Sequence, residues 1–327
     1  MTPRSPRPDR PTTTNLSPIP SPPTGTKARA WAELLRLPAL FTVPGDALAG
    51  AATTGNRPNP RTLLAIASSL CLYEAGMALN DWADQTEDAL ERPHRPLPSG
   101  RIHPSGALVA AGALTAAGLA LAARAGRPAL AVAAPLAATV WAYDLALKRT
   151  PAGPAAMATA RGLDLLLGAT ATGGSARPAL PSALTLATHT LAVTTVSRGE
   201  TRGGSPLAPL AALTTTGMLA WRLTRTPGAS GAAPSRHPAA DPSRHPAADP
   251  LRTVLAAAFL TTSGRPLLHA TLNPSPPLTQ RAVGGGIRAM IPLQAALAAR
   301  SGALASALLT AALAPAARRF ARKVSVT

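Results

Sequence analysis

The stretch LLAIASSLCLYEAGMALNDWADQTEDALERPHRPLPSG, residues 63–100, joins an apolar segment to an acidic one and then to a basic one. Its first part has the length and apolar character of a helix that crosses a membrane. The acidic part supplies Asn80, Asp81, Asp84 and Asp88. Positions 80, 84 and 88 are four residues apart, so on one continuous helix they share a face, with Asp81 beside them.

This acidic cluster predicts a metal site. Carboxylates gathered at the end of an apolar helix repel one another unless a cation neutralises them, and Mg²⁺ takes a few carboxylates together with waters and substrate phosphates. The loop that follows, ERPHRPLPSGRI, carries Arg92 and Arg95. A basic loop beside an acidic face suits a magnesium-bound polyanion. The alternative interpretation is a solvated, acid-rich loop after a helix.

The two motifs together resemble the UbiA family of intramembrane prenyltransferases, which carries N-D-x-x-D-x-x-x-D followed by a basic R-P-L-P-S-G loop. All four fixed positions of the first motif are present, and RPLPSG is intact at residues 95–100. The resemblance implies Mg²⁺ as cofactor and a polyprenyl diphosphate as donor. It implies that Arg92 and Arg95 bind this donor, and that the metal ligands include Asn80, Asp81, Asp84 and Asp88.

Composition places the chain in a membrane. Of its 327 residues, 46% are hydrophobic and only 14% are charged, whereas about 25% charged residues is usual in soluble domains. Apolar blocks of nearly the length needed to span a bilayer recur at 35–54, 62–79, 105–123, 128–147, 155–173, 179–196, 206–223, 251–269 and 287–315. We therefore expect an all-α integral membrane protein, a bundle of about nine transmembrane helices around a central cavity. A soluble bundle of Ala-rich helices is the alternative.

The net charge of +18 indicates contact with lipid rather than with nucleic acid. The basic residues lie in the tails and between the apolar blocks, where they meet anionic headgroups. We expect a multi-pass protein of the plasma membrane, with the lipid bilayer and a small-molecule acceptor as partners and no nucleic acid.

The chain is predicted to hold one membrane domain, residues 31–316, between a disordered basic tail at 1–30 and a basic tail at 317–327. The octad PSRHPAAD occurs twice in succession at 234–249, which is typical of a low-complexity loop insertion; we place it within 227–250. Pro and Gly in 263–286 predict a second long loop.

Two further groups of polar residues interrupt apolar blocks. In WAYDLALKRT, Asp144 and Lys148 are four residues apart and can share a helical face; the family resemblance implies that Tyr143 and Lys148 contact the donor diphosphate. In ARGLDLLLGA, Arg161 and Asp164 can pair with each other. Ionisable groups inside a membrane usually face the interior and mark function, so we expect this pair to line the pocket; a purely structural ion pair is the alternative.

The second acidic motif of the family is altered. The resemblance predicts D-x-x-x-D at the end of the sixth span, but Ser197 and Thr201 stand at those positions. Glu200 is the nearby acid, so we expect it to hold a second metal, or Arg198 to neutralise the diphosphate in its place. His189, on the same predicted face, is expected to bind the acceptor. These segments resemble the branch of the family typified by EboC-like proteins.

We therefore expect a membrane prenyltransferase that moves a prenyl group to a small, aromatic or cyclic acceptor with the help of Mg²⁺. The candidate catalytic residues are Lys148, Tyr143, Arg161 and Asp164. One alternative is a UbiA-type terpene cyclase, against which the low aromatic content of 3% counts, because aromatic rings stabilise carbocations. The other is a non-catalytic membrane protein that binds or transports lipid, against which the intact first motif counts.

Overall fold

The structure, a computed structural model, describes residues 27–36, 41–200, 203, 205–225 and 248–325. Within these ranges the chain is helical and contains no strand, which confirms the predicted all-α class. The elements are α1 (Lys27–Leu34), α2 (Val43–Ala52), α3 (Pro60–Ala83), α4 (Gln85–Glu91), α5 (Pro104–Ala125), α6 (Arg127–Ala142), η2 (Tyr143–Leu147), α7 (Gly153–Gly173), η3 (Arg177–Ala179), α8 (Leu180–Ser197), α9 (Leu207–Thr224), α10 (Ala248–Leu272), α11 (Pro276–Arg300) and α12 (Leu304–Ser325).

Local sequence sets where the central helices begin. Asn59 caps α3, because its side chain accepts from the amides of Arg61 and Thr62 while Thr62 Oγ1 accepts from the Asn59 amide. Pro60 then occupies the first turn, where its missing N–H has no intrahelical partner to lose. Pro residues also stand in the first turns of α5, α6, α7 and α11.

Five of the described helical segments are long and apolar enough to cross a membrane. The predicted count of nine crossings stays a prediction, because the other described helices are shorter or less apolar than these five. The five are Pro60–Ala83, Pro104–Ala125, Arg127–Leu147, Arg177–Ser197 and Pro276–Arg300.

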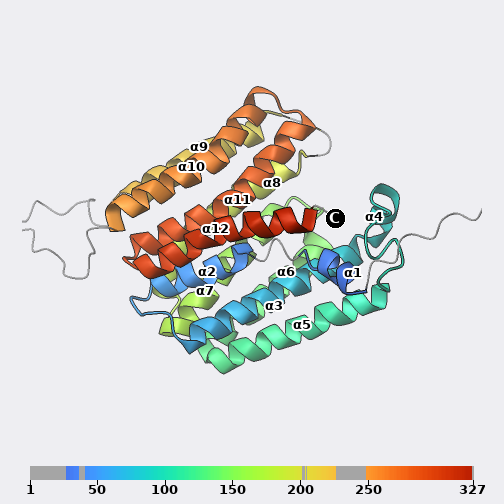
Figure 1. Cartoon of the computed structure of the whole chain (residues 1–327), viewed down its shortest axis with the longest axis horizontal. Helices are drawn as coiled ribbons and strands as arrows, with labels where there is room; N and C mark the ends of the chain where they lie inside the picture. Colours follow the sequence, from blue (N-terminus) through green and yellow to red (C-terminus); the bar gives the residue numbers. More distant parts are fainter. Residues whose placement is uncertain (1–26, 37–40, 201–202, 204, 226–247, 326–327) are drawn as a thin grey trace, which may run out of the picture.

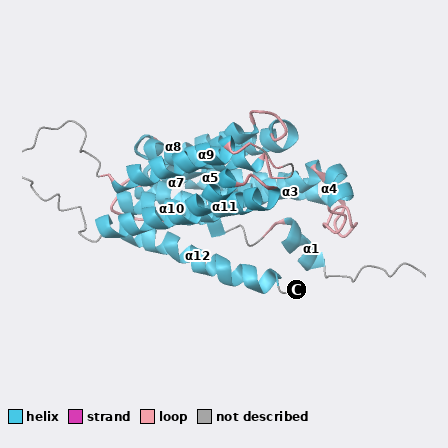
Figure 2. Ribbon diagram, turned by 90° about the horizontal axis from the view of Figure 1, so that it is seen from above, coloured by secondary structure: helices cyan, strands magenta, loops and turns pink. Residues whose placement is uncertain are grey.

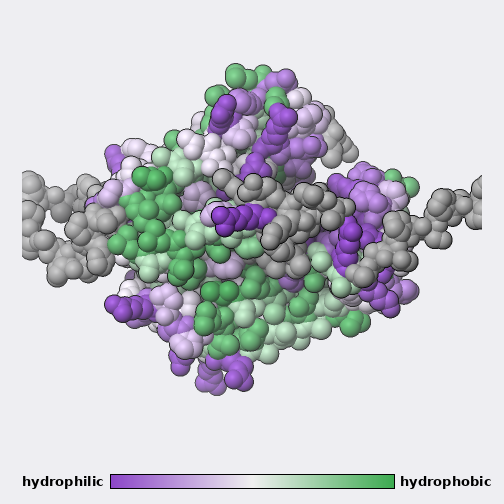
Figure 3. All heavy atoms as spheres, in the orientation of Figure 1, coloured by the Kyte–Doolittle hydropathy of each residue, from purple (hydrophilic) through white to green (hydrophobic). Residues whose placement is uncertain are grey.

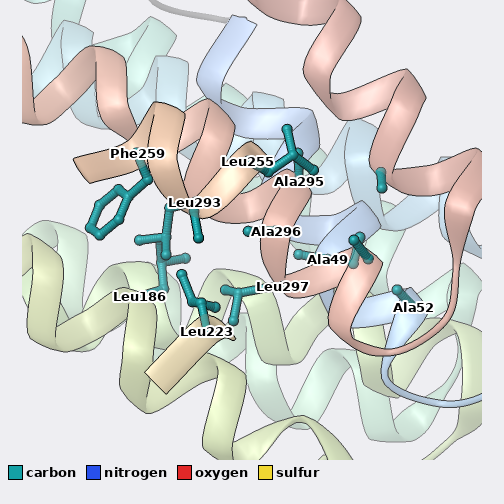
Figure 4. Packing of buried hydrophobic residues seen from close by; sticks show 14 of the residues in the cluster. Ala49, Ala52, Leu186, Leu223, Leu255, Phe259, Leu293, Ala295, Ala296 and Leu297 are labelled. Atoms are coloured by element: carbon teal, nitrogen blue, oxygen red, sulfur yellow. The ribbon is translucent and has the colours of Figure 1, made fainter. Parts of the chain in front are cut away.

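The helices form two packed groups that contact each other at the centre of the molecule. On one side α3 packs against α5 and α6 against α7; on the other, α8, α9, α10 and α11 pack together, with α12 on α11 (Figures 1 and 2). The larger core lies in the second group, where Leu186, Phe259 and Leu293 come together from α8, α10 and α11 (Figure 4). Because α2 contacts both α7 and α11, it joins the two groups.

Two glycines allow the close crossing of α2 and α7. A Cβ on Gly50 would lie 1.9 Å from the Leu165 carbonyl oxygen, and one on Gly168 would lie 2.3 Å from the Ala47 carbonyl oxygen. Small residues let helix backbones approach in this way. The crossing brings Asp46 of α2 to the centre of the molecule, where it is fully buried.

Several sequence predictions on boundaries need correction. The predicted loop at 263–286 is wrong: α10 continues to Leu272 and α11 begins at Pro276, because Pro276 stands in a first turn and Gly285 lets α11 approach Pro266 of α10. The apolar block 287–315 is not one helix, since α11 ends at Arg300 and α12 begins at Leu304.

The predicted tails lie largely outside the described residues. Residues 1–26 and 226–247, with the duplicated octad, are not described, whereas residues 27–30 belong to α1 and 248–250 to α10. Helix α12 extends through the predicted boundary at 316 to Ser325.

The surface is divided as a membrane protein requires. On the face shown in Figure 3, hydrophobic surface covers much of α3 and α5, and hydrophilic surface gathers at the end of the molecule where α4 lies. This polar end carries the two sequence motifs.

Candidate functional site: an acidic and basic cluster above a buried cavity

The site begins where α3 ends. Residue Asp84 separates α3 from α4, with φ −96° and ψ 5°, so the single continuous helix predicted for the first motif is interrupted. Backbone hydrogen bonds nonetheless run from Asp84 N to Asn80 O and from Asp88 N to Asp84 O, at 2.9 and 2.8 Å. The bend sends the motif's side chains to two different sets of partners.

The first set of contacts joins Asp81 and Asp88 to arginines, two of which, Arg92 and Arg95, lie in the basic loop. Asp81 Oδ1 lies 2.9 Å from Arg36 Nη2 and 3.5 Å from Arg95 Nη1, and Arg95 Nη1 lies 2.6 Å from Asp88 Oδ2. Arg92 adds a longer contact of 3.6 Å to Asp88. Both acids are buried, so these cations compensate charges that would otherwise be costly.

The second set faces η2. Asn80 Nδ2 donates to Asp144 Oδ1 at 3.1 Å, and Lys148 Nζ lies 2.7 Å from Asp84 Oδ1. Arg149 reaches the same Asp84 oxygen at 3.1 Å. The sequence pointed to Asn80, Asp84 and Lys148 but did not place Asp144 in the site. The signal available was an acid at the end of an apolar block, four residues before Lys148.

These residues fit a metal that arrives with its substrate. Carboxylate and carboxamide oxygens are the hard ligands that Mg²⁺ prefers, and the Asn80–Asp84 set provides both kinds. Within the described residues, no group of three or more His, Cys, Asp or Glu side chains converges closely enough to hold a metal by itself. Phosphate oxygens and waters would therefore have to complete the coordination.

A cavity of about 310 Å³ opens beside this cluster. Asn80, Tyr143 and Asp144 line its end next to the cluster, and Ser69, Arg161 and Asp164 line the other end. The wall between them is mainly apolar and comprises Leu72, Leu136, Val140, Met157 and Ala160. From Ser69 to Asn80, α3 rises about 16 Å, so the cavity joins two polar ends through an apolar middle.

At the far end of the cavity, Arg161 and Asp164 have other hydrogen-bond partners than the predicted contact with each other. Arg161 Nη1 donates to Asp46 Oδ2 at 2.5 Å, while Asp164 accepts a hydrogen bond from Ser69. Gln294 Nε2 donates to Asp46 Oδ1 at 2.6 Å. Arg161 and Asp164 line the cavity, but the carboxylate that pairs with Arg161 is that of Asp46 in α2.

Three remaining candidates lie at different depths. His189 is buried between α8, α10 and α11, where its Nε2 is 3.0 Å from the Gly286 carbonyl oxygen and its ring meets Phe259 edge-on; it does not line the cavity. Arg198 donates to the Thr150 carbonyl at 2.6 Å, beside the polar cluster. Burial raises the pKa of the Glu200 carboxyl, and the charge of Arg92 opposes this shift.

The pattern of the UbiA prenyltransferase family matches residues 39–224 of this chain. The chain belongs to this family. The match covers α2 to α9 and therefore every candidate residue at the polar end. With five apolar helices in the described part of the chain, this UbiA family member is a multi-pass membrane protein.

Individual relatives match shorter stretches of this UbiA family member. It is 38% identical over 76 residues to the digeranylgeranylglyceryl phosphate synthase of Ignicoccus hospitalis, covering 23% of this chain and 25% of the relative. It is 35% identical over 128 residues to the synthase of the same name from Methanopyrus kandleri, covering 38% and 45%. The chain thus spans less than half the length of these curated relatives.

Solved structures share the fold over most of the chain. A UbiA homologue from Aeropyrum pernix K1 has a TM-score of 0.58 at 18% identity, covering 79% of this chain and 96% of the other. A digeranylgeranylglyceryl phosphate synthase structure has a TM-score of 0.56 at 18% identity, covering 85% and 99%. A homologue from Archaeoglobus fulgidus bound to DMAPP and Mg²⁺ has a TM-score of 0.55 at 17% identity, covering 80% and 98%.

Proposed function

We propose that this UbiA family member is a Mg²⁺-dependent prenyltransferase of the plasma membrane. It would move a prenyl group from a polyprenyl diphosphate to a small polar acceptor. The observation that carries the proposal is the gathering of Asn80, Asp84 and Lys148 beside a cavity whose polar end Asn80 and Asp144 line. The names of the relatives, and the DMAPP and Mg²⁺ bound by a homologue of the same fold, support it.

Charge balance assigns the roles at the polar end. A bound Mg²⁺ would neutralise charge on the leaving diphosphate, with Asn80 and Asp84 among its ligands. Lys148 now pairs with Asp84 and would turn to the diphosphate, where a fixed cation favours charge developing on the leaving group. Arg95 and Arg198 stand at the same end, and Tyr143 lines the cavity mouth as a hydrogen-bond donor.

The rest of the cavity suits the organic parts of the substrates. The apolar wall would shelter the prenyl group and exclude water, which would otherwise capture the allylic cation. Arg161 and Asp164, with Ser69, offer hydrogen bonds to a polar acceptor. Asp46 pairs with Arg161, and Gln294 in turn donates to Asp46. We do not include His189, because it packs in the core away from this wall.

Pyrophosphate release by the purified full-length protein in nanodiscs tests the proposal. With DMAPP or geranyl diphosphate and a membrane lipid extract as acceptor, release should require Mg²⁺ and stop on addition of EDTA. Product masses with and without the extract separate a transferase from a cyclase. Donor binding without any Mg²⁺-dependent release would contradict the proposal and favour a lipid-binding protein.

A further inference from the structure

The amide of Asn80 is oriented by a single buried acid. Asn80 Nδ2 donates to Asp144 Oδ1 at 3.1 Å, and Asp144 is only 5% exposed. An ionised carboxylate can only accept hydrogen bonds, and the reverse amide orientation would set two oxygens against each other. The Asn80 carbonyl oxygen is therefore directed away from Asp144 and is available as a ligand.

The segment that carries Asp144 makes two side-chain contacts with the first motif. Asp144 and Lys148 are four residues apart, as are Asn80 and Asp84, and the two pairs meet one to one: Asp144 with Asn80, Lys148 with Asp84. Tyr143–Leu147 is a π-helical turn, in which Lys148 N bonds to Tyr143 O at 2.9 Å. Such turns are rare and occur frequently at functional sites.

Close packing of α3 on α6 makes this contact possible. A Cβ on Gly76, one turn before Asn80, would lie 3.0 Å from Val140 Cγ1 and 3.9 Å from Asp144 Oδ2. The glycine thus leaves room for Val140 of α6 against α3, whereas the contact with the Asp144 carboxylate would be an ordinary one.

We propose that Asp144 is a positioning residue for the metal: it fixes the Asn80 amide so that the carbonyl oxygen of Asn80 serves as a Mg²⁺ ligand. The proposal rests on the proposed function, since it assumes that Asn80 binds the metal. Partners that orient a metal ligand typically change metal affinity by about 10- to 100-fold when they are mutated. In this chain Ser197 and Thr201 stand where the resemblance predicts the acids of the second motif. The metal ligands of the first motif, and the residue that orients them, would then matter more.

Mn²⁺ binding, measured by electron paramagnetic resonance on the full-length protein in nanodiscs with inorganic pyrophosphate present, tests this without turnover; Mn²⁺ and pyrophosphate without protein give the baseline. Asp144→Asn should weaken Mn²⁺ binding by about tenfold or more, and Asn80→Ala should do the same. Because Asp144 acts through Asn80, the double variant should bind no more weakly than the weaker single variant. Glu87→Gln, an exposed acid that pairs with Arg149, is the control and should bind like the wild type.

Each outcome decides something. Wild-type affinity in Asp144→Asn would overturn the proposal, even if its melting temperature fell, because that result is expected of a purely structural acid. Additive losses in the double variant would also overturn it, because Asp144 would then act independently of Asn80. No saturable Mn²⁺ binding by the wild type in the presence of pyrophosphate would contradict the proposed metal site itself, and with it this inference.

Discussion

At the scale of single residues, the ion pair between Asp84 and Lys148 is the contact that donor binding would change under the proposed function. Lys148 Nζ lies 2.7 Å from Asp84 Oδ1, and its side chain is 12% exposed against 20% for Asp84. Asp84 thus faces two cations, Lys148 and Arg149, and Arg149 also pairs with Glu87. Under the proposed function, a magnesium diphosphate would offer Asp84 a metal and Lys148 a phosphate, so neither charge would be left unpaired.

Asp84→Asn should therefore lower Mg²⁺-dependent donor consumption by about 100-fold or more, the loss typical of removing a group that stabilises developing charge. Lys148→Met should raise the donor KM or lower kcat by about tenfold or more. Steady-state pyrophosphate release measures both. Glu87→Gln is the matched control, since Glu87 shares Arg149 with Asp84 but is 53% exposed. Near-normal turnover in Asp84→Asn would refute the assignment.

Arg198 and Glu200 stand where the family's second motif is altered. Arg198 donates to Thr150 O, which places its charge at the polar end. A guanidinium can hold phosphate through two parallel hydrogen bonds, so Arg198→Ala should raise the donor KM or lower kcat by about tenfold. Glu200→Gln should raise the Mg²⁺ concentration needed for half-maximal activity. If both variants keep wild-type kinetics, the second half of the site lies elsewhere, most plainly around Arg161 and Asp164.

At the scale of helices, the sequence foretold what depends on local pattern. The apolar blocks located α3, α5, α6 and α8 closely, and the first motif located the polar end. The bend at Asp84 was missed because helical hydrogen bonding continues through it. The loop predicted at 263–286 was wrong because Pro and Gly there serve helix starts and helix packing rather than turns.

The periodicity of the sequence could not predict contacts between helices that are far apart along the chain. Asp46 and Arg161 are 115 positions apart, and Asp46 and Gln294 are 248 apart, so neither pairing leaves a periodic signal. The sequence offered Asp164, three residues from Arg161, as the obvious partner. Tertiary packing instead supplies Asp46, which lies in the first turn of α2, where the helix dipole favours a negative charge.

The α2–α7 crossing gives a stability prediction. Gly168→Ala should destabilise the protein by about 1–3 kcal/mol, as overpacking does, because the new Cβ meets the Ala47 backbone at 2.3 Å rather than a side chain that can move. Gly112→Ala in α5 is the control, since a Cβ there has no neighbour within 4 Å. Melting temperatures in detergent compare the two. Equal melting temperatures would show that the crossing is looser than described.

At the scale of the whole molecule, the charged cluster lies at one end of the bundle and the cavity wall inside the bundle is mainly apolar. The acids and bases of the first motif and its basic loop gather at the end where α4 lies (Figure 1). The cavity descends from there between α3, α6 and α7. Under the proposed function, this arrangement would let a diphosphate stay in contact with cations and water while its prenyl chain lies among apolar side chains. The central claim is that these two halves belong to one transfer reaction.

Mass spectrometry of membrane lipids tests that claim most directly. Cells that produce the wild-type chain should be compared with cells that produce Asp84→Asn at the same membrane level. Only cells with the wild-type chain should contain a lipid whose mass exceeds that of a cellular acceptor by a whole number of isoprene units. Identical lipid profiles in the two strains, with both proteins folded in the membrane, would contradict it.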